Sequence, residues 1–162
     1  MKKMKLAVIS DSHYAIDQLE KLLKFLKREK IQHLAHAGDL VTKGVGDLFR
    51  QFPEINCYIA IGNCDYGEEL VTLNNLPHVM IDTVVQFELE GKHFAISHQD
   101  GIAQRALTGQ SVDVFFHGHT HITRIDDHLH PMIINPGSLM DGHGFLLLDV
   151  PSLKIDRRFR FT

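Results

Sequence analysis

The sequence has little cysteine and no long hydrophobic run. Its two cysteines, Cys57 and Cys64, are too few for the disulfide framework of a small secreted domain. They are seven positions apart, a spacing that is poorly suited to a structural zinc site. The apolar stretch over residues 6–9 stops at Ser10-Asp11 and is too short for a signal-peptide core or a membrane span. We therefore expect a cytoplasmic protein without a membrane partner.

A strong excess of charge of either sign is also missing. The chain has 17 Lys and Arg residues against 20 Asp and Glu residues, a formal net charge of −3. This balance gives no extended basic surface for nucleic acid, so no stable nucleic-acid complex is expected. A small anionic substrate is still compatible with this near-balanced charge, because a bound metal ion can attract it locally. The chain shows no linker or low-complexity tract, and we expect one compact domain over residues 1–162.

Histidine, in contrast, is abundant, with twelve residues in the chain. Neutral imidazole is a common metal ligand, and carboxylate and amide oxygens suit harder divalent cations, so their combination favours a labile pair of transition metals. The polar segments that carry this pattern are Asp11-Ser12-His13, Gly38-Asp39, Gly62-Asn63-Cys64-Asp65, Ser97-His98 and His117-Gly118-His119-Thr120-His121. Surface or packing roles are expected for His33, His36, His78, His93, His128, His130 and His143.

Hydrophobic patterning places these segments at strand ends. Residues 5–9, 31–37 and 55–61 are short apolar runs that predict buried strands, each followed by a polar segment. Between them, apolar residues at helical spacing predict a helix from residue 16, with Asp17 and Glu20 resembling a capping box, and a weaker helix over 46–52. Sites in such α/β arrangements collect outside the carboxyl ends of strands.

The second half of the chain favours strands. A hairpin that ends at His98 is predicted by the alternation of apolar and polar residues over 83–90, a turn at Gly91 and a second strand-like run over 92–97. A short helix over 102–107, a strand over 112–116, and further strands over 133–134, 145–150 and 153–161 follow, the last two as a hairpin. The fold class expected is α/β, a two-sheet β-sandwich flanked by helices.

In this order the polar segments resemble the calcineurin-like metallophosphoesterase superfamily, specifically its small single-domain bacterial and archaeal phosphodiesterase branch. Ile134-Asn135-Pro136-Gly137-Ser138 also matches that branch. The resemblance implies that one metal is held by Asp11, His13, Asp39 and His121, and the other by Asp39, Asn63, His98 and His119. It also implies attack on phosphorus by a hydroxide that bridges two metals about 3.5–4 Å apart. Asn63 and His98 are the residues expected to act in catalysis.

Taken singly, most of these residues have ordinary structural explanations. Asp11 and Ser12 suit a turn after a strand, Gly38-Asp39 is more often a turn than a ligand, and a lone His98 is typical of a partly buried structural residue. Their joint occurrence in order favours the metal roles. His117 is expected to be structural, because adjacent strand residues point to opposite faces. Asp65 either orients ligands or stabilises its own loop.

The chain departs from the phosphoprotein phosphatase relatives of this superfamily. Those relatives carry a histidine after the metal-binding Asn and an Asp three positions after the bridging Asp, which together protonate the leaving group. Here the positions hold Cys64 and Thr42, so the usual acid is missing. Lys43 occupies the place of a basic residue that contacts phosphate, and Cys64 is also expected to touch the substrate. Gln99 stands where relatives often have Gly, and we expect its larger side chain to narrow the pocket.

We therefore predict a metal-dependent phosphodiesterase that acts on a small phosphodiester. Manganese is the first expectation for the two divalent ions, with iron, zinc or nickel as alternatives, because availability in cells overrides intrinsic affinity. The alternatives are a phosphomonoesterase or protein phosphatase, and a non-catalytic scaffold like the retromer subunit, which resembles the same branch but lacks part of the histidine set. Whether the chain forms a homo-oligomer is left open.

Overall fold

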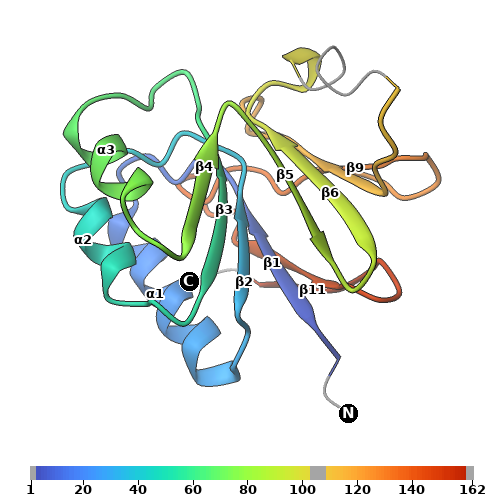
Figure 1. The fold of residues 1–162 in the computed structure, drawn as a ribbon, viewed down its shortest axis with the longest axis horizontal. Coiled ribbons are helices and arrows are strands. Elements are labelled where there is room, and N and C mark those ends of the chain that lie inside the picture. The colour runs from blue at the N-terminus through green and yellow to red at the C-terminus, as the bar shows by residue number, and fades with distance from the viewer. Residues whose placement is uncertain (1–2, 103–108, 160–162) are drawn as a thin grey trace.

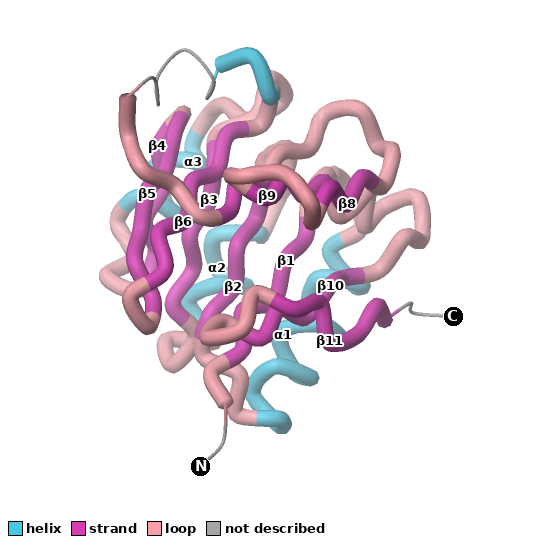
Figure 2. Tube along the Cα trace, turned by 90° about the vertical axis from the view of Figure 1, so that its right-hand side faces the viewer, coloured by secondary structure: helices cyan, strands magenta, loops and turns pink. Residues whose placement is uncertain are grey.

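The computed structural model describes residues 3–102 and 109–159. In these ranges the chain folds into two facing sheets, with helices over the outer side of the first (Figure 1). Turned so that the second sheet faces the viewer, the helices that cover the first sheet lie behind the strands (Figure 2). This confirms the expected α/β sandwich. The helices on this outer side are α1 (Ile16–Glu29), α2 (Val45–Arg50) and α3 (Glu68–Asn74).

The first sheet has the order β11-β10-β1-β2-β3-β4, and its last four strands run parallel. The parallel part consists of β1 (Lys5–Ile9), β2 (His33–His36), β3 (Asn56–Ala60) and β4 (Val79–Asp82). At the other edge, the hairpin of β10 (Phe145–Asp149) and β11 (Lys154–Phe159) joins β1 in antiparallel register. The carboxyl ends of β1, β2 and β3 therefore open at one common edge.

The second sheet has the order β5-β6-β7-β9-β8. Its strands are β5 (Val84–Leu89), β6 (Lys92–Ser97), β7 (Val114–Phe116), β8 (Arg124–Asp126) and β9 (Met132–Asn135). The β5–β6 hairpin is the one predicted from alternation, while β6, β7 and β9 run parallel. Because β6 and β7 are parallel, the residues that follow them also emerge at one edge.

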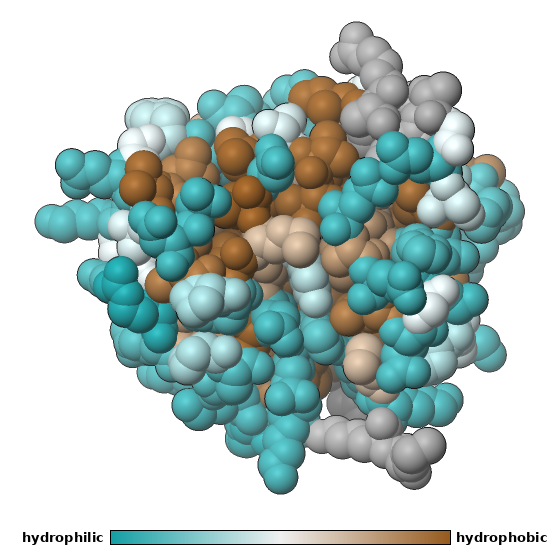
Figure 3. All heavy atoms as spheres, viewed as in Figure 1, coloured by the Kyte–Doolittle hydropathy of each residue, from teal (hydrophilic) through white to brown (hydrophobic). Residues whose placement is uncertain are grey.

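Two apolar layers hold these elements together. One lies between α1, α2 and the first sheet and includes Leu22, Phe49 and Ile59, all essentially without exposure. The other lies between the sheets and includes Val8, Phe94 and Phe116. Burial of this apolar area is the main source of stability and involves no polar site residue. On the face shown in Figure 3, hydrophobic residues gather in the upper half and hydrophilic ones border them.

Several local expectations were wrong or incomplete. The helix after β1 begins at Ile16, but its amino end at Ala15 has no side-chain cap, so the capping box of Asp17 and Glu20 does not form. The sequence did not predict α3, β4 or β8. These elements are short, and α3 fully buries only Leu73, so each has a weak periodic signal.

The helix expected over 102–107 lies mostly outside the described residues, as does the end of the strand expected over 153–161. No helix in the described part of the chain has the length and apolarity needed to cross a bilayer.

Candidate metal centre

The seven predicted ligands lie in loops that follow five strands. Asp11 and His13 come after β1. The other ligands are Asp39 after β2, Asn63 after β3, His98 after β6, and His119 and His121 after β7. Backbone hydrogen bonds join the loops: the Asp11 N–H donates to Gly38 O at 2.9 Å and the His13 N–H donates to Asp39 O at 2.9 Å. The Gly118 N–H donates to His98 O at 3.0 Å. The edges of both sheets thus meet at one place.

One group of donor atoms gathers around His13. Its Nε2 atom lies 3.3 Å from His121 Nε2 and 3.6 Å from Asp11 Oδ1. His121 Nε2 is 3.2 Å from the same Asp11 oxygen, and Asp39 Oδ2 is 3.8 Å from His13 Nε2. Ligand atoms that share one small cation at about 2.1 Å stand roughly 3–3.5 Å apart, so this spacing suits a single ion.

A second group gathers around His98. Its Nε2 atom lies 3.2 Å from Asp39 Oδ2 and 3.3 Å from His119 Nδ1. His119 Nδ1 is in turn 3.1 Å from Asn63 Oδ1. Asp39 Oδ2 faces both groups, the position that a bridging ligand requires. The structure therefore brings all seven predicted ligands together, with Asp39 between the two groups.

Asp11 supplies a direct test of whether a cation fits. Its side chain has no exposure, and Oδ2 accepts hydrogen bonds from Ser10 Oγ at 2.5 Å and from the His119 N–H at 3.1 Å. Oδ1 is buried and has no hydrogen-bond partner, although two imidazole nitrogens face it. A buried carboxylate oxygen without a partner is costly. A divalent cation between Oδ1 and those nitrogens would satisfy it, so the residues present fit a metal ion.

Two histidines are oriented by partners behind them. His98 Nδ1 is 2.7 Å from the carbonyl oxygen of Ala37, and His121 Nδ1 is 2.7 Å from Asp141 Oδ2. When Nδ1 carries the proton that it donates, Nε2 presents its lone pair to the site, as metal-ligating histidines commonly do. Asp141 was not predicted, because no local pattern links it to a residue twenty positions earlier.

The charges in the group reinforce one another. Burial raises the pKa of Asp39, but hydrogen bonds from His98 and the Cys64 N–H outweigh it and lower that pKa to about 2. Burial lowers the pKa of His98, and its bonds to Asp39 and the Ala37 carbonyl outweigh that effect, so the net shift is upward. Asp39 is therefore ionised at any ordinary pH and available to a cation.

Asp65 fastens the loop that carries Asp39. Its carboxylate accepts four backbone N–H groups, and the donors are Asp39 at 2.8 Å, Leu40 at 2.9 Å, Val41 at 2.8 Å and Gly62 at 2.7 Å. The Cys64 N–H donates to Asp39 Oδ1 at 2.8 Å. Of the two roles open for Asp65, the structure shows loop stabilisation that also positions Asp39.

The backbone at the site is unusual. Among the described residues, eight non-glycine residues have positive φ angles, and five of them are predicted ligands: Asp11, His13, Asp39, His119 and His121. The left-handed region costs free energy for such residues and is concentrated at functional sites. Gly62 and Gly118 permit the close packing, because a Cβ at either would overlap the carboxylate of Asp39 or the side chains of Ser10 and Asp11.

Buried polar residues behind the site complete the frame. His36 has no exposure, and its Nδ1 accepts the Gly38 N–H at 3.1 Å while Nε2 lies 2.8 Å from Ser12 Oγ. Burial, with a smaller contribution from His98, lowers the pKa of His36 to about 3. The packing role expected for His36 is therefore also a positioning role for two site loops.

The segment that follows β9 also supports the site. Asn135 Nδ2 donates to Gly118 O and to Thr120 Oγ1, each at 3.0 Å. Ser138 Oγ donates to the carbonyl oxygen of Asp11 at 3.0 Å. The segment Asn135-Pro136-Gly137-Ser138 thus braces the loops after β1 and β7.

The remaining predicted residues border the two groups. Lys43 is exposed. The backbone after it is held by Glu69, whose carboxylate accepts the N–H groups of Gly44 at 2.7 Å and Gly46 at 2.8 Å. Cys64 is exposed beside Asn63. Gln99 and His117 line a hollow next to His119. His117 is only 3% exposed and belongs to neither donor group, as expected.

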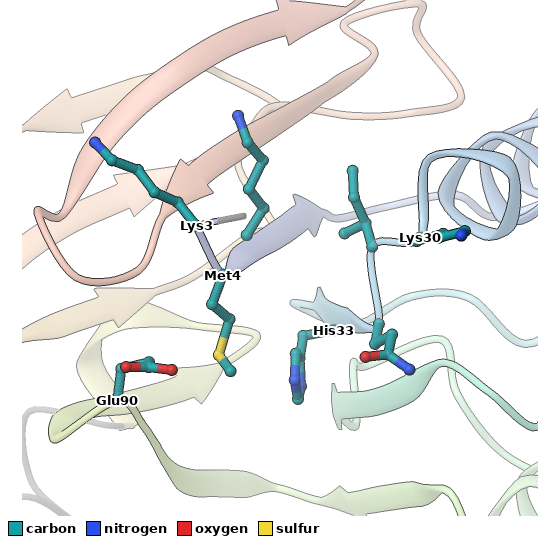
Figure 4. A pocket seen from close by; sticks show the side chains of 8 residues that line it. Lys3, Met4, Lys30, His33 and Glu90 are labelled. Carbon is teal, nitrogen blue, oxygen red and sulfur yellow. The ribbon is translucent and has the colours of Figure 1, made fainter. Parts of the chain in front are cut away.

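A separate cavity of about 240 Å³ lies at the amino ends of β1 and β2, lined by residues that include Lys3, Met4, Lys30, His33 and Glu90 (Figure 4). It is at the opposite end of the strands from the donor groups. Its side chains do not form any of the metal-binding groups found in the described residues.

Comparisons with known proteins identify the family and the fold. Residues 4–151 match the calcineurin-like phosphoesterase superfamily domain. A phosphodiesterase from Methanocaldococcus jannaschii is 27% identical over 143 residues, covering 83% of each chain. The structure of an archaeal phosphodiesterase superposes with a TM-score of 0.78 at 24% identity, covering 98% of this chain and all of that one.

Vps29 from Entamoeba histolytica, solved with Zn²⁺, superposes with a TM-score of 0.66 at 20% identity over 98% of this chain and all of that one. At this identity the likeness establishes the shared fold alone. The family-model match over residues 4–151 shows that the chain belongs to the calcineurin-like phosphoesterase superfamily.

Proposed function

We propose that this phosphoesterase hydrolyses a small phosphodiester with the help of two divalent cations. The observation that carries the proposal is the pair of donor groups that share Asp39, together with the unpartnered Oδ1 atom of buried Asp11. Bound cations supply Lewis acidity, which lowers the pKa of water and polarises the phosphoryl oxygens. Manganese is the first expectation, and iron, zinc or nickel would also suit these ligands.

The ligand assignment follows the two groups. Asp11, His13, Asp39 and His121 would hold the first cation. Asp39, Asn63, His98 and His119 would hold the second. Asn63 contributes a neutral oxygen, so the site gains a ligand without another negative charge where an anionic ester must dock.

The border of the site suits an accessible ester. Lys43 offers a positive charge at the exposed loop after Asp39, and Cys64 offers a polar contact beside Asn63. Tyr14 and Ile122 directly follow His13 and His121 in the chain and are 82% and 69% exposed. These side chains give an organic ester group apolar surface near the phosphate.

A leaving-group acid is harder to find among these residues. His98 has one ring nitrogen against the Ala37 carbonyl and the other against Asp39, so neither is available to a substrate. Cys64 stands where phosphatase relatives have their acid. We therefore favour a phosphodiester with a good leaving group over a monoester or a phosphoprotein.

Metal content and turnover of the purified protein test the proposal. We expect divalent metal in the protein and faster hydrolysis of an aryl phosphodiester than of its monoester. Asp11→Ala should abolish turnover and lower the metal content, chiefly at the first site, and His128→Ala, an exposed histidine in a polar turn, should leave both unchanged. Full metal occupancy without hydrolysis of any ester in a panel would instead favour a protein-binding scaffold.

A further inference from the structure

Cys64 is placed beside the first donor group. Its Sγ atom, a ring nitrogen of His13 and a carboxylate oxygen of Asp39 all lie within 4.8 Å of one another. The position is fixed from the backbone, because the Cys64 N–H donates to Asp39 Oδ1 at 2.8 Å. Asn63 Nδ2 also approaches Sγ at 3.5 Å. The thiol is thus held at the mouth of the site by the residue that both groups share.

We propose that Cys64 Sγ is a direct ligand of the cation held by His13 and Asp39. The inference rests on the proposed metal centre and adds sulfur to a set otherwise made of nitrogen and oxygen. A second observation points to a cation at the same place: Asp11 Oδ1, fully buried and without a hydrogen-bond partner, lies 3.6 Å from His13 Nε2.

Coordination changes the state of the thiol. Without a cation, Cys64 would be a neutral thiol whose Sγ atom lies within 4.8 Å of an Asp39 carboxylate oxygen. When a cation binds, the S–H bond breaks, its proton passes to solvent, and the sulfur electron pair forms the bond to the metal. One proton is therefore released per sulfur bound. A substrate that approaches the same cation would have to compete with or displace this ligand.

Sulfur also changes which metal the site favours. Thiolates select zinc and other soft or borderline ions, whereas manganese prefers oxygen. The first site should therefore favour zinc or ferrous iron over the manganese expected from the nitrogen and oxygen ligands. Cys57, the chain's other cysteine, cannot take this role, because it is buried in β3 and its Sγ donates to the Ile55 carbonyl oxygen at 3.4 Å.

Titration of the apo protein with Co²⁺ tests the inference spectroscopically. A thiolate ligand gives a near-ultraviolet sulfur-to-cobalt charge-transfer band that imidazole and carboxylate ligands do not give. We expect this band in the wild-type protein and in Cys57→Ala, and its loss in Cys64→Ser with Co²⁺ still bound. Cys64→Ser should also weaken Zn²⁺ binding by about 10-fold or more while Mn²⁺ affinity changes much less.

Alkylation by iodoacetamide, followed by peptide mass spectrometry, provides a second measurement. Zn²⁺ should protect Cys64, and buried Cys57 should stay unmodified with or without metal. Stoichiometric Co²⁺ binding without a thiolate band, or a band that survives Cys64→Ser, would overturn the sulfur ligand and leave the phosphodiesterase proposal intact. Absence of any Co²⁺ or Zn²⁺ binding would overturn both.

Discussion

The imidazole of His121 is held by the carboxylate of Asp141, with Nδ1 and Oδ2 2.7 Å apart. The hydrogen bond from His121 is the main reason that the pKa of Asp141 is lowered. The Asp141 N–H donates in turn to Ser138 Oγ at 3.2 Å, and Ser138 Oγ donates to the Asp11 carbonyl oxygen. A residue outside every sequence motif therefore connects His121 to the loop that carries Asp11.

Asp141→Asn should weaken metal binding at the first site, because the amide does not hold Nδ1 as strongly and the basicity of His121 falls. The expected loss of affinity is about 10–100-fold, the usual effect of removing such a partner. Isothermal titration with Zn²⁺ measures it, and Asp127→Asn, an exposed aspartate in a turn, is the control. Equal affinities for Asp141→Asn and wild type would show that the contact does not support the metal.

Substitution of the shared ligand should change metal occupancy at both sites, whereas substitution of a ligand of one site should change it chiefly there. Asp39→Asn should reduce occupancy at both positions, because Asp39 Oδ2 faces His13 and His98. His121→Ala should chiefly empty the first position and His119→Ala the second. Elemental analysis with anomalous scattering gives each occupancy. Two full metals in a folded Asp39→Asn protein would be inconsistent with a bridge.

Chelation should remove activity and leave the fold. The two apolar layers contain none of the proposed ligands, so most of the unfolding free energy does not depend on metal. We expect a cooperative thermal transition in chelator-treated protein, at a lower midpoint than in the loaded protein, with activity restored by added metal. Loss of the transition would mean that metal binding creates the fold.

His36 should make the metal-free protein less stable in acid. Its pKa is about 3 when folded and near 6.5 when unfolded, so the unfolded chain binds a proton that the folded one excludes. The contribution of His36 to the free energy of unfolding is complete above pH 6.5. It declines as the pH falls toward 3, by up to about 1.4 kcal/mol per pH unit for one proton. His36→Gln should show a shallower decline in urea unfolding. Parallel curves for the two proteins would exclude His36 as the cause.

Short-range patterns predicted that the candidate ligands follow strands, because each polar segment comes directly after an apolar run, while the metal roles came from the family resemblance. Asp39 follows β2 and His98 follows β6, strands of different sheets, and the two residues meet because the two sheets face each other. Asp141 and the positioning role of His36 escaped, since their partners are distant in the chain and leave no local spacing. The cap expected from Asp17 failed because spacing alone does not fix where the helix begins.

The last prediction concerns leaving groups. Hydrolysis should depend steeply on the leaving-group pKa, because neither Cys64 nor Thr42 supplies the acid of the phosphatase relatives, and both ring nitrogens of His98 already have partners. Aryl phosphodiesters should therefore react faster than alkyl ones. Restoring the pair as Cys64→His with Thr42→Asp should flatten this dependence and improve poor leaving groups by about 10²-fold, the lower end for general acid catalysis.

Cys64→His alone should give a smaller gain, since its imidazole lacks the orienting carboxylate, and Thr42→Asp alone is the matched control. A series of aryl and alkyl diesters, with kcat/KM plotted against leaving-group pKa for each variant, gives the slopes to compare. Metal occupancy must be measured alongside, because replacing Cys64 also removes the proposed sulfur ligand. A wild-type slope near zero, with chemistry shown to limit the rate, would mean that another group donates the proton. The enzyme would then have a general acid even though Cys64 replaces the histidine of the phosphatase relatives.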